Sequence, residues 1–160
     1  MATGKVTELH YLELLNDIAS GERRAGIHLA AWAAKTQNPE LKSCLSLVAD
    51  RETSHYHIFK RRISELGHSW VENHAPEFEE RLRVSNSDMP DVEKIRWGKS
   101  QQAQRQGPAI RERYEAAIAD ETVDPLTCSL LRWFSDVEAD SVSLLRQAYD
   151  TIETAGQRGE

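Results

Sequence analysis

The stretch Ala49-Asp50-Arg51-Glu52-Thr53-Ser54-His55 lies in the middle of a helical pattern that runs from Pro39 to Gly67. At helical spacing, one stripe of this pattern consists of Leu41, Leu45, Val48, Glu52, His55, Phe59 and Leu66. Such a repeat keeps one seam of a helix against a partner helix. Apolar residues occupy nearly all of the seam, but its two central positions are a carboxylate and an imidazole, one turn apart. A buried charge is costly unless it is paired or binds a metal. Either the seam is less buried than its apolar residues suggest, or a positive group lies in the core.

The composition indicates an ordinary globular helical protein. The chain has 160 residues, of which 39% are hydrophobic and 29% are charged, and a chain of this length can bury roughly 70% of its unfolded surface as one domain. The net charge of −6 argues against binding to nucleic acid or to anionic membranes, because both need an excess of Lys and Arg. No apolar run approaches about 18 residues and no basic-then-apolar leader is present, so we expect a soluble cytoplasmic protein. Cys44 and Cys128 are far apart in sequence and are expected to be free thiols.

The pattern predicts an all-α fold with four helices, at residues 7–35, 39–67, 90–120 and 124–154. Thr7 is the expected N-cap of the first helix, Pro39 the first residue of the second, and Gly67 the residue that ends it. Residues 68–89 form a long connection, with a short helix at about 76–84, and its length favours a crossover along the bundle. Gly107-Pro108 predicts a kink in the third helix, and residues 155–160 are expected to form a frayed tail.

A second carboxylate interrupts the apolar seam of the first helix. This residue is Glu22, and the rest of that seam consists of Leu12, Leu15, Ile18, Ala25, Leu29 and Trp32. A Ser20-Gly21 pair precedes it and weakens the helix locally, by about 1 kcal/mol for the glycine. Glu22 therefore joins Glu52 and His55 as a polar residue expected in the core.

The two halves of the chain correspond at an offset of 86 residues. The matching pairs are Pro39 and Pro125, Leu45 and Leu131, Val48 and Phe134, Phe59 and Leu145, and Leu66 and Ile152. This correspondence indicates two helical hairpins with a shared packing template. At the same offset Glu52 pairs with Glu138, which is thus expected at the matching core position of the fourth helix.

Glu22 and Glu52-Thr53-Ser54-His55, together with Asn38-Pro39-Glu40-Leu41 and Glu65-Leu66-Gly67, resemble the ferritin-like superfamily, and most closely its rubrerythrin-like branch. The resemblance covers roughly residues 7–154. It implies a ferritin-like four-helix bundle of two hairpins joined by a long crossover. It also implies a di-iron or di-manganese centre, held by a Glu from each of two helices and an ExxH motif from each of the other two. In such a centre carboxylates bridge the cations, and open positions accept O2 or peroxide.

The second half of the chain departs from the family's ligand set. The offset maps His55 onto Ser141, which cannot replace an imidazole, and maps Glu22 onto Pro108, whose side chain cannot bind a metal. Glu112 lies four residues after Pro108, about 6 Å along a helix, and is a further candidate, while Glu115 is a weaker one. The candidate ligands are therefore Glu22, Glu52, His55, Glu138 and Glu112. They favour a di-iron site, with manganese, a single metal ion, or no metal as the alternatives.

Two classes of function follow from the resemblance. In the first, the chain is a non-haem iron or manganese oxidoreductase that acts on O2 or hydrogen peroxide and has no catalytic residues apart from its metal ligands. The two CxxC pairs of the rubredoxin domain are missing, so its electrons would come from a separate donor. In the second, the chain is a metal-free bundle that serves as a binding or assembly module, in which Glu52 and His55 form a satisfied buried pair. A homodimer is expected in either case, with no nucleic acid and no membrane as partners.

Overall fold

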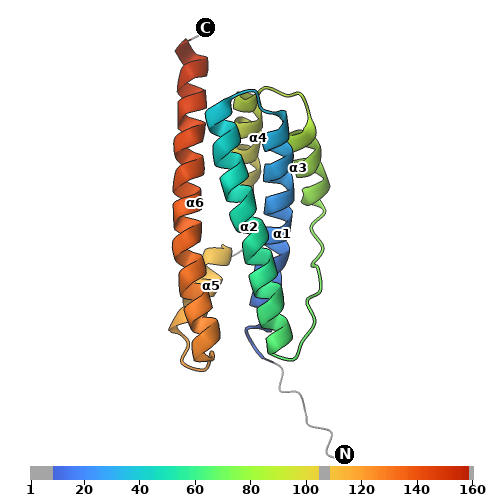
Figure 1. The fold of residues 1–160 in the computed structure, drawn as a ribbon, viewed down its shortest axis with the longest axis vertical. Coiled ribbons are helices and arrows are strands. Elements are labelled where there is room, and N and C mark those ends of the chain that lie inside the picture. Colours follow the sequence, from blue (N-terminus) through green and yellow to red (C-terminus); the bar gives the residue numbers. More distant parts are fainter. Residues whose placement is uncertain (1–8, 105–108, 159–160) are drawn as a thin grey trace, which may run out of the picture.

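The structure is a computed structural model that describes residues 9–104 and 109–158. Within these ranges the chain folds into six helices and no strand, which confirms the predicted all-α class (Figure 1). The helices are α1 Leu12–Lys35, α2 Pro39–Glu65, α3 Glu77–Asn86, α4 Asp91–Ala103, α5 Ile110–Ala119 and α6 Pro125–Arg158.

Helices α1 and α2 form an antiparallel hairpin whose ends are defined by local hydrogen bonds (Figure 1). The Asn38 side chain accepts a hydrogen bond from the Leu41 amide at 2.9 Å and so caps α2, and Pro39 occupies the first turn, where its missing N–H costs nothing. Gly67 has a φ of 83° beyond the other end of α2. The amides of Gly67 and His68 donate to the carbonyl oxygens of Ser64 and Ile63. This pattern is a Schellman motif, which needs a left-handed residue at the Gly67 position.

Asp124 holds the start of α6 against the ends of α1 and α2. Its Oδ1 accepts hydrogen bonds from the Thr127 amide at 2.9 Å, which caps α6, and from Arg62 Nη2 of α2 at 2.8 Å. Tyr11, directly before α1, donates its hydroxyl to Asp124 Oδ2 at 2.7 Å. Three segments that are distant in sequence therefore meet at one end of the molecule.

Two apolar clusters fill the interior, one towards each end of the long helices. The first contains Leu15, Ile18, Phe59, Ile63, Leu131 and Phe134 with their neighbours. The second contains Leu29, Trp32, Leu41, Leu45, Val48 and Ile95. Burial of each large side chain stabilises the fold by about 1.5–3 kcal/mol. Between the two clusters, the inward faces of α1, α2 and α6 carry the polar residues Glu22, Glu52, His55 and Glu138.

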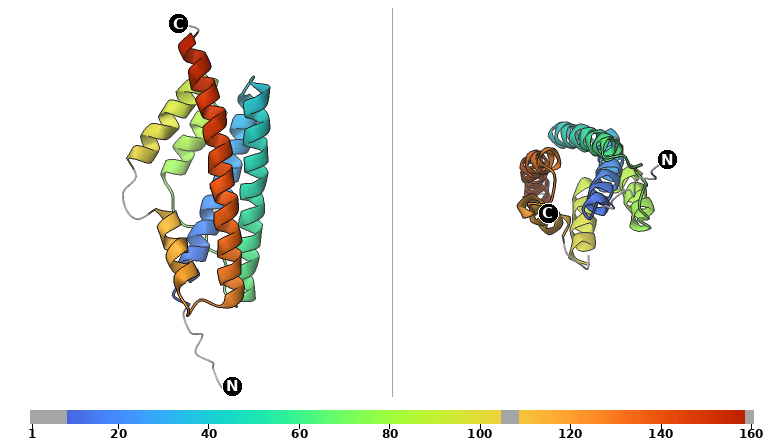
Figure 2. Two further views of the ribbon diagram at one scale, coloured as in Figure 1. Left: turned by 90° about the vertical axis from the view of Figure 1, so that its left-hand side faces the viewer. Right: turned by 90° about the horizontal axis from the view of Figure 1, so that it is seen from below.

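The predicted single third helix at 90–120 is wrong, because α4 ends at Ala103 and α5 begins at Ile110. The two short helices lie beside different parts of α6 (Figure 2). A proline lacks a backbone donor and disfavours helical geometry in the residue before it, and α4 buries only Lys94 and Ile95. Neither the local backbone preference of the sequence nor the burial of side chains therefore favours a single helix over residues 90–120. The kink expected at Gly107-Pro108 lies outside the described residues.

The remaining boundaries differ from the prediction in smaller ways. Helix α1 starts at Leu12, five residues after Thr7, which itself lies outside the described residues. The connection at 68–89 contains α3, which packs along α1. Helix α6 continues to Arg158, so the frayed tail expected from residue 155 is wrong as far as Arg158. Alanine, glutamine and arginine are good helix formers, and the residues Ala155, Gln157 and Arg158 therefore favour this extension of the helix.

None of the helices in residues 9–104 and 109–158 combines the length and the apolar character that crossing a membrane would require.

Candidate metal site

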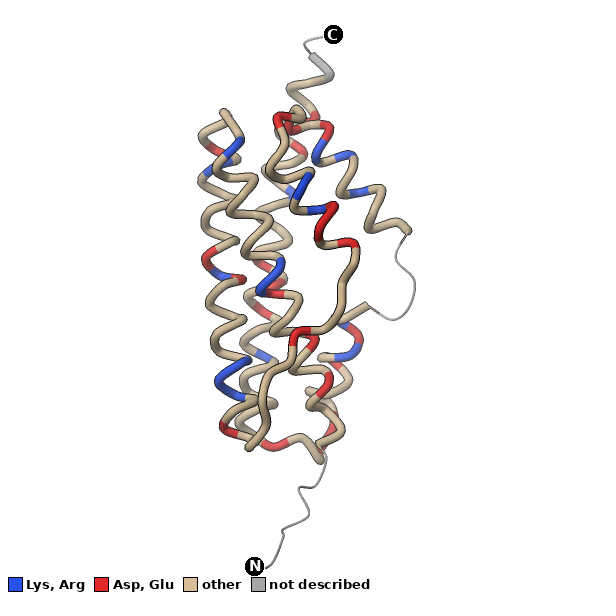
Figure 3. The backbone as a smooth tube through the Cα atoms, turned by 90° about the vertical axis from the view of Figure 1, so that its right-hand side faces the viewer, with Lys and Arg blue, Asp and Glu red and all other residues tan. Residues whose placement is uncertain are grey.

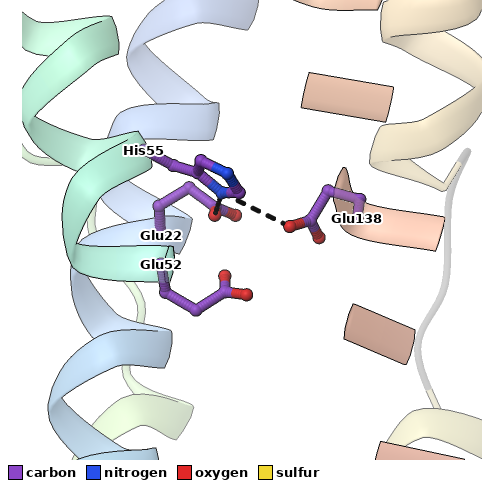
Figure 4. A group of neighbouring side chains, drawn as sticks. All are labelled: Glu22, Glu52, His55 and Glu138. Carbon is purple, nitrogen blue, oxygen red and sulfur yellow. Dashed lines mark hydrogen bonds and ion pairs between the residues drawn. The ribbon is translucent and has the colours of Figure 1, made fainter. Parts of the chain in front are cut away.

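Four side chains from three helices converge between the two apolar clusters. Glu22 comes from α1, Glu52 and His55 from α2, and Glu138 from α6, and all four point toward one another (Figure 4). Each offers one donor atom, and these donor atoms all lie within 4.8 Å of one another. A transition metal binds nitrogen and oxygen donors at about 2.0–2.3 Å. Opposite donors around one ion are thus separated by roughly 4–4.6 Å. A single ion would need shifts of only a few tenths of an ångström from this arrangement.

Helical periodicity and one glycine bring the ligands together. Glu52 and His55 are three residues apart and face the same side of α2. On α1, Gly26 lies one turn beyond Glu22, and a Cβ atom there would meet Thr53 Oγ1 at 2.6 Å and the Ala49 carbonyl oxygen at 3.2 Å. The absence of a side chain at Gly26 therefore allows α1 to approach α2 closely beside the cluster, which places Glu22 against His55.

Hydrogen bonds link three of the four residues. His55 Nδ1 lies 2.8 Å from Glu22 Oε2, and Glu22 and Glu52 share a further side-chain hydrogen bond. Glu138 differs, because its Oε1 lies 3.4 Å from His55 Nδ1 and is buried without a hydrogen-bond partner in the described part of the chain. An orphaned buried carboxylate oxygen is costly, and a cation between Glu138 and its neighbours would remove that cost.

The cluster holds two buried carboxyl groups, those of Glu22 and Glu52, beside the carboxyl group of Glu138, whose side chain is 22% exposed. Glu22, Glu52 and His55 are at most 8% exposed. Burial raises the pKa of Glu52 to about 10, with further contributions from Glu22 and Glu138. Burial also raises the pKa of Glu22 to about 8, aided by the charge of Glu138 and opposed by the hydrogen bond from Glu52. In the metal-free protein, protons on Glu22 and Glu52 thus neutralise these two carboxyl groups. A metal ion would displace these protons.

Aromatic rings surround the imidazole. The rings of Trp133 and Phe134 contact His55 edge-to-face, with centroid distances of 5.2 and 5.1 Å. Phe134 is buried, whereas Trp133 is 42% exposed and therefore lies between His55 and solvent. Tyr114 of α5 packs edge-to-face against Phe134, with the ring centroids 5.3 Å apart. The sequence analysis did not place Trp133 beside His55; its position five residues before Glu138 was the available signal.

The structure brings four of the five candidate ligands together and leaves Glu112 apart. Glu112 is exposed in the first turn of α5, whose buried residues are Tyr114 and Ala117. The spacing that favoured Glu112 assumed one continuous helix, and the separation of α4 from α5 removes that basis. Glu115, the weaker candidate, is paired with Arg111 at 2.7 Å.

Ser141, which stands where the second imidazole of the family's pattern is expected, has another partner. It is 2% exposed, and its hydroxyl accepts a hydrogen bond from Arg51 Nη1 at 3.2 Å. The same guanidinium nitrogen pairs with Asp140 at 2.7 Å. Ser141 therefore joins α2 to α6 and is not a ligand in this arrangement. Pro108, the counterpart of Glu22, lies outside the described residues.

Comparison with known proteins returns no matching family model, no matching curated protein and no matching solved structure. The geometry of the four residues therefore carries the functional argument.

Proposed function

We propose that this chain is a ferritin-like metal-binding protein in which Glu22, Glu52, His55 and Glu138 hold one divalent transition-metal ion. The observation that carries the proposal is the convergence of three carboxylates and one imidazole from three helices, in a largely buried site where Glu138 Oε1 has no hydrogen-bond partner among the described residues. Isolated carboxylates are rarely buried together unless a cation compensates them.

The donor set favours iron or manganese. Carboxylates suit hard cations such as Mn(II), imidazole suits iron, and a set without thiolates disfavours copper(I) and structural zinc. The distances within the cluster fit one ion more directly than the two of a full ferritin-like centre, which uses six protein ligands. Four protein ligands leave two positions open on an octahedral ion, where O2 or hydrogen peroxide could bind.

The reaction that we propose is the reduction of O2 or hydrogen peroxide, with electrons from a separate donor. The chain's own residues would hold the metal, orient His55 so that Nδ1 faces it, and exclude bulk water with the aromatic rings of Trp133 and Phe134. The exposed indole of Trp133 supports the view that an external donor reaches the site from this side. A homodimer remains part of the proposal, as in the rubrerythrin-like branch.

The test is metal binding by the full-length chain. Anaerobic titration of chelator-treated protein with Fe(II) or Mn(II) is expected to give one ion per chain and a higher melting temperature. Glu52→Gln should weaken metal binding by more than ~100-fold. Replacement of a residue that only hydrogen-bonds to a ligand costs ~10–100-fold, and Glu52 is proposed to be a ligand itself. Trp133 fluorescence should be quenched on binding, and Trp133→Phe should remove most of that response.

Glu112→Gln is the matched control, because it makes the same change at an exposed carboxylate outside the cluster. It should bind metal as the wild type does. If neither metal binds and the melting temperature does not move, the metal proposal is wrong.

A metal-free binding or assembly module is the second candidate. The observation in its favour is that Arg51 holds Ser141 in place of a second imidazole, while Glu22, Glu52 and His55 satisfy one another. In that case the Glu52→Gln variant should melt within a few degrees of the wild type, with or without added metal.

A further inference from the structure

Arg51 joins α2 to α6 beside the candidate metal site, although it belongs neither to the four candidate ligands nor to the apolar clusters. Its Nη1 donates to Asp140 Oδ2 at 2.7 Å and to the buried hydroxyl of Ser141 at 3.2 Å. The other basic residues of α2 lie toward its two ends, and Arg51 is the one between Lys42 and Lys60 (Figure 3). This guanidinium therefore makes a polar contact between the middle of α2 and the middle of α6.

Helices α2 and α6 lie side by side and run in opposite directions (Figure 1). Contacts on successive turns connect them, and these are Phe59 with Phe134, His55 with Glu138, and Arg51 with Ser141. On each helix the contacting residues are three or four positions apart, so the contacts lie one above the other. The contact between Arg51 and Ser141 is therefore the neighbour, one turn away, of the contact between His55 and Glu138.

Glu138 depends on the placement of α6 for its position in the cluster. Its Oε1 lies 3.4 Å from His55 Nδ1 and has no hydrogen-bond partner among the described residues, so no hydrogen bond of that atom orients the carboxylate. A metal ligand has to be held within about 0.5 Å of its productive position. In the metal-free protein the backbone of α6 must therefore provide this precision, and Ser141 lies one turn beyond Glu138 on that backbone.

Asp140 and Ser141 are suited to fix α6 because they are adjacent in sequence. Neighbouring residues of an α-helix point about 100° apart, so a nitrogen bound to both side chains resists rotation of α6 as well as sliding along α2. Ser141 is 2% exposed, and loss of its donor is costly for a buried hydroxyl group. Asp140 is 59% exposed, and an ion pair at such a position contributes little alone. The contact with Ser141 is therefore expected to matter most.

We propose that Arg51 is a positioning residue for the metal site. By holding Asp140 and Ser141, it sets the place of α6 at which the Glu138 carboxylate faces His55 before an ion arrives. The inference rests on the proposed function, because Glu138 has to occupy this place in order to bind the ion. Ser141 then serves the site through Arg51 and is not itself a ligand.

The first test measures Mn(II) affinity of the full-length chain. Arg51→Met keeps the length of the side chain and removes its hydrogen bonds, and it should weaken Mn(II) binding at least about ten-fold, as loss of a residue that orients a ligand does. Electrostatics alone predicts the opposite sign, because removal of a neighbouring cation strengthens the binding of another cation. Wild-type or tighter binding of Mn(II) by Arg51→Met would overturn the proposal.

Arg61→Met is the matched control for Arg51→Met. Arg61 also belongs to α2, but it is 82% exposed and pairs with Glu65 of the same helix at 3.0 Å. The substitution removes the same charge without touching α6, so Mn(II) affinity should equal that of the wild type. A loss as large as that in Arg51→Met would show that the charge of α2, and not the contact with α6, governs binding.

The second test needs no metal and separates this proposal from the metal proposal. His55 Nδ1 lies 2.8 Å from Glu22 and 3.4 Å from Glu138, so its ¹⁵N chemical shift reports on both carboxyl groups. In the presence of a chelator, Arg51→Met should move the His55 Nδ1 signal, and Arg61→Met should leave it in place. An unmoved signal in Arg51→Met would overturn the positioning role even if the wild type binds Mn(II). A moved signal in a chain that binds no Mn(II) would uphold the positioning role and reject the metal site.

Two further variants test the contacts themselves. In Arg51→Lys a single ammonium nitrogen can reach both acceptors, as a single guanidinium nitrogen does now, so this variant should retain more Mn(II) affinity than Arg51→Met. Ser141→Ala should weaken Mn(II) binding in the wild type and add little to the loss in Arg51→Met, because the contact is then already absent. Equal affinities of the lysine and methionine variants, or fully additive losses, would show that these contacts do not position Glu138.

Discussion

In the folded protein the carboxyl groups of Glu52 and Glu22 have pKa values well above that of a glutamate in an unfolded chain. Their ordinary pKa is 4.5, and in the folded metal-free protein burial raises it to about 10 for Glu52 and to about 8 for Glu22. Between pH 4.5 and pH 8 the folded state therefore binds more protons than the unfolded state, and stability must fall as the pH rises. Metal binding has the opposite dependence, because the ion must displace those protons.

We therefore predict that the chelator-treated protein melts at lower temperature as the pH is raised from about 5 to 8. The expected slope is at most about 1.4 kcal/mol of unfolding free energy per pH unit for each carboxyl group. Melting curves at several pH values measure the slope, and Glu52→Gln should reduce it. The increase in melting temperature caused by Mn(II) should be larger at pH 8 than at pH 6. A metal-induced increase that shrinks as the pH rises would contradict the assignment of these carboxyls as ligands.

The residues of the candidate site could largely be predicted, because polar side chains at positions where the helical pattern expects apolar ones are easy to recognise. Glu22, Glu52 and His55 interrupt apolar seams, and Glu138 follows from the correspondence between the two halves. Their convergence within 4.8 Å depends on packing that no local pattern encodes. The hydrogen bond between Arg51 and Ser141 and the contact of Trp133 with His55 join residues 90 and 78 positions apart, respectively. Periodicity along one helix carries no information about such pairs.

At the scale of helices, the close approach of α1 and α2 depends on Gly26. An alanine there would place its Cβ 2.6 Å from Thr53 Oγ1, 3.2 Å from the Ala49 carbonyl oxygen and 3.3 Å from the Thr53 amide nitrogen. The threonine side chain can rotate, but the backbone atoms cannot give way without separating the helices.

We predict that Gly26→Ala destabilises the protein by about 1–3 kcal/mol, as overpacking does elsewhere, and weakens metal binding because Glu22 moves away from His55. Gly21→Ala is the matched control, since its Cβ meets nothing within 4 Å. It should stabilise the protein by about 0.5–1 kcal/mol through helix propensity alone. Urea unfolding measures both variants. Equal and positive effects of the two substitutions would show that the helices are not in close contact at Gly26.

The helices also show where prediction from sequence succeeds and fails. Helix α2 has an Asn cap, a proline in its first turn and a terminal glycine, so local chemistry encodes both of its ends. The segment at 90–120 has turn residues near its centre and few buried side chains, and its continuity could not be judged from periodicity. The error spread to the site, because Glu112 was placed on one helix at 90–120, whereas the structure has the two shorter helices α4 and α5 there.

At the scale of the whole molecule, the candidate metal-binding residues Glu22, Glu52, His55 and Glu138 lie between the two apolar clusters, where α6 faces the α1–α2 hairpin. Glu138 is the one member of the cluster that comes from α6, and its Oε1 has no hydrogen-bond partner among the described residues. In the metal-free protein Glu138 thus contributes little to holding α6 in place, although Asp124 fastens one end of α6 and Tyr149 stacks on Trp32 towards the other. The hairpin itself is already held by the close contact at Gly26.

We therefore predict that metal binding slows amide hydrogen exchange in the middle of α6, around Phe134 to Val142, more than in α1 or α2. An ion that binds only the folded state stabilises it by about 2.7 kcal/mol at a hundred-fold excess over its Kd, and opening of α6 breaks the ligand set. Exchange followed by mass spectrometry, with Mn(II) and with chelator, measures the difference segment by segment. In Glu138→Gln the added protection of α6 should disappear, whereas Glu112→Gln should retain it. Uniform protection of all three helices, or protection that survives in Glu138→Gln, would show that the ion does not connect α6 to the hairpin through this carboxylate.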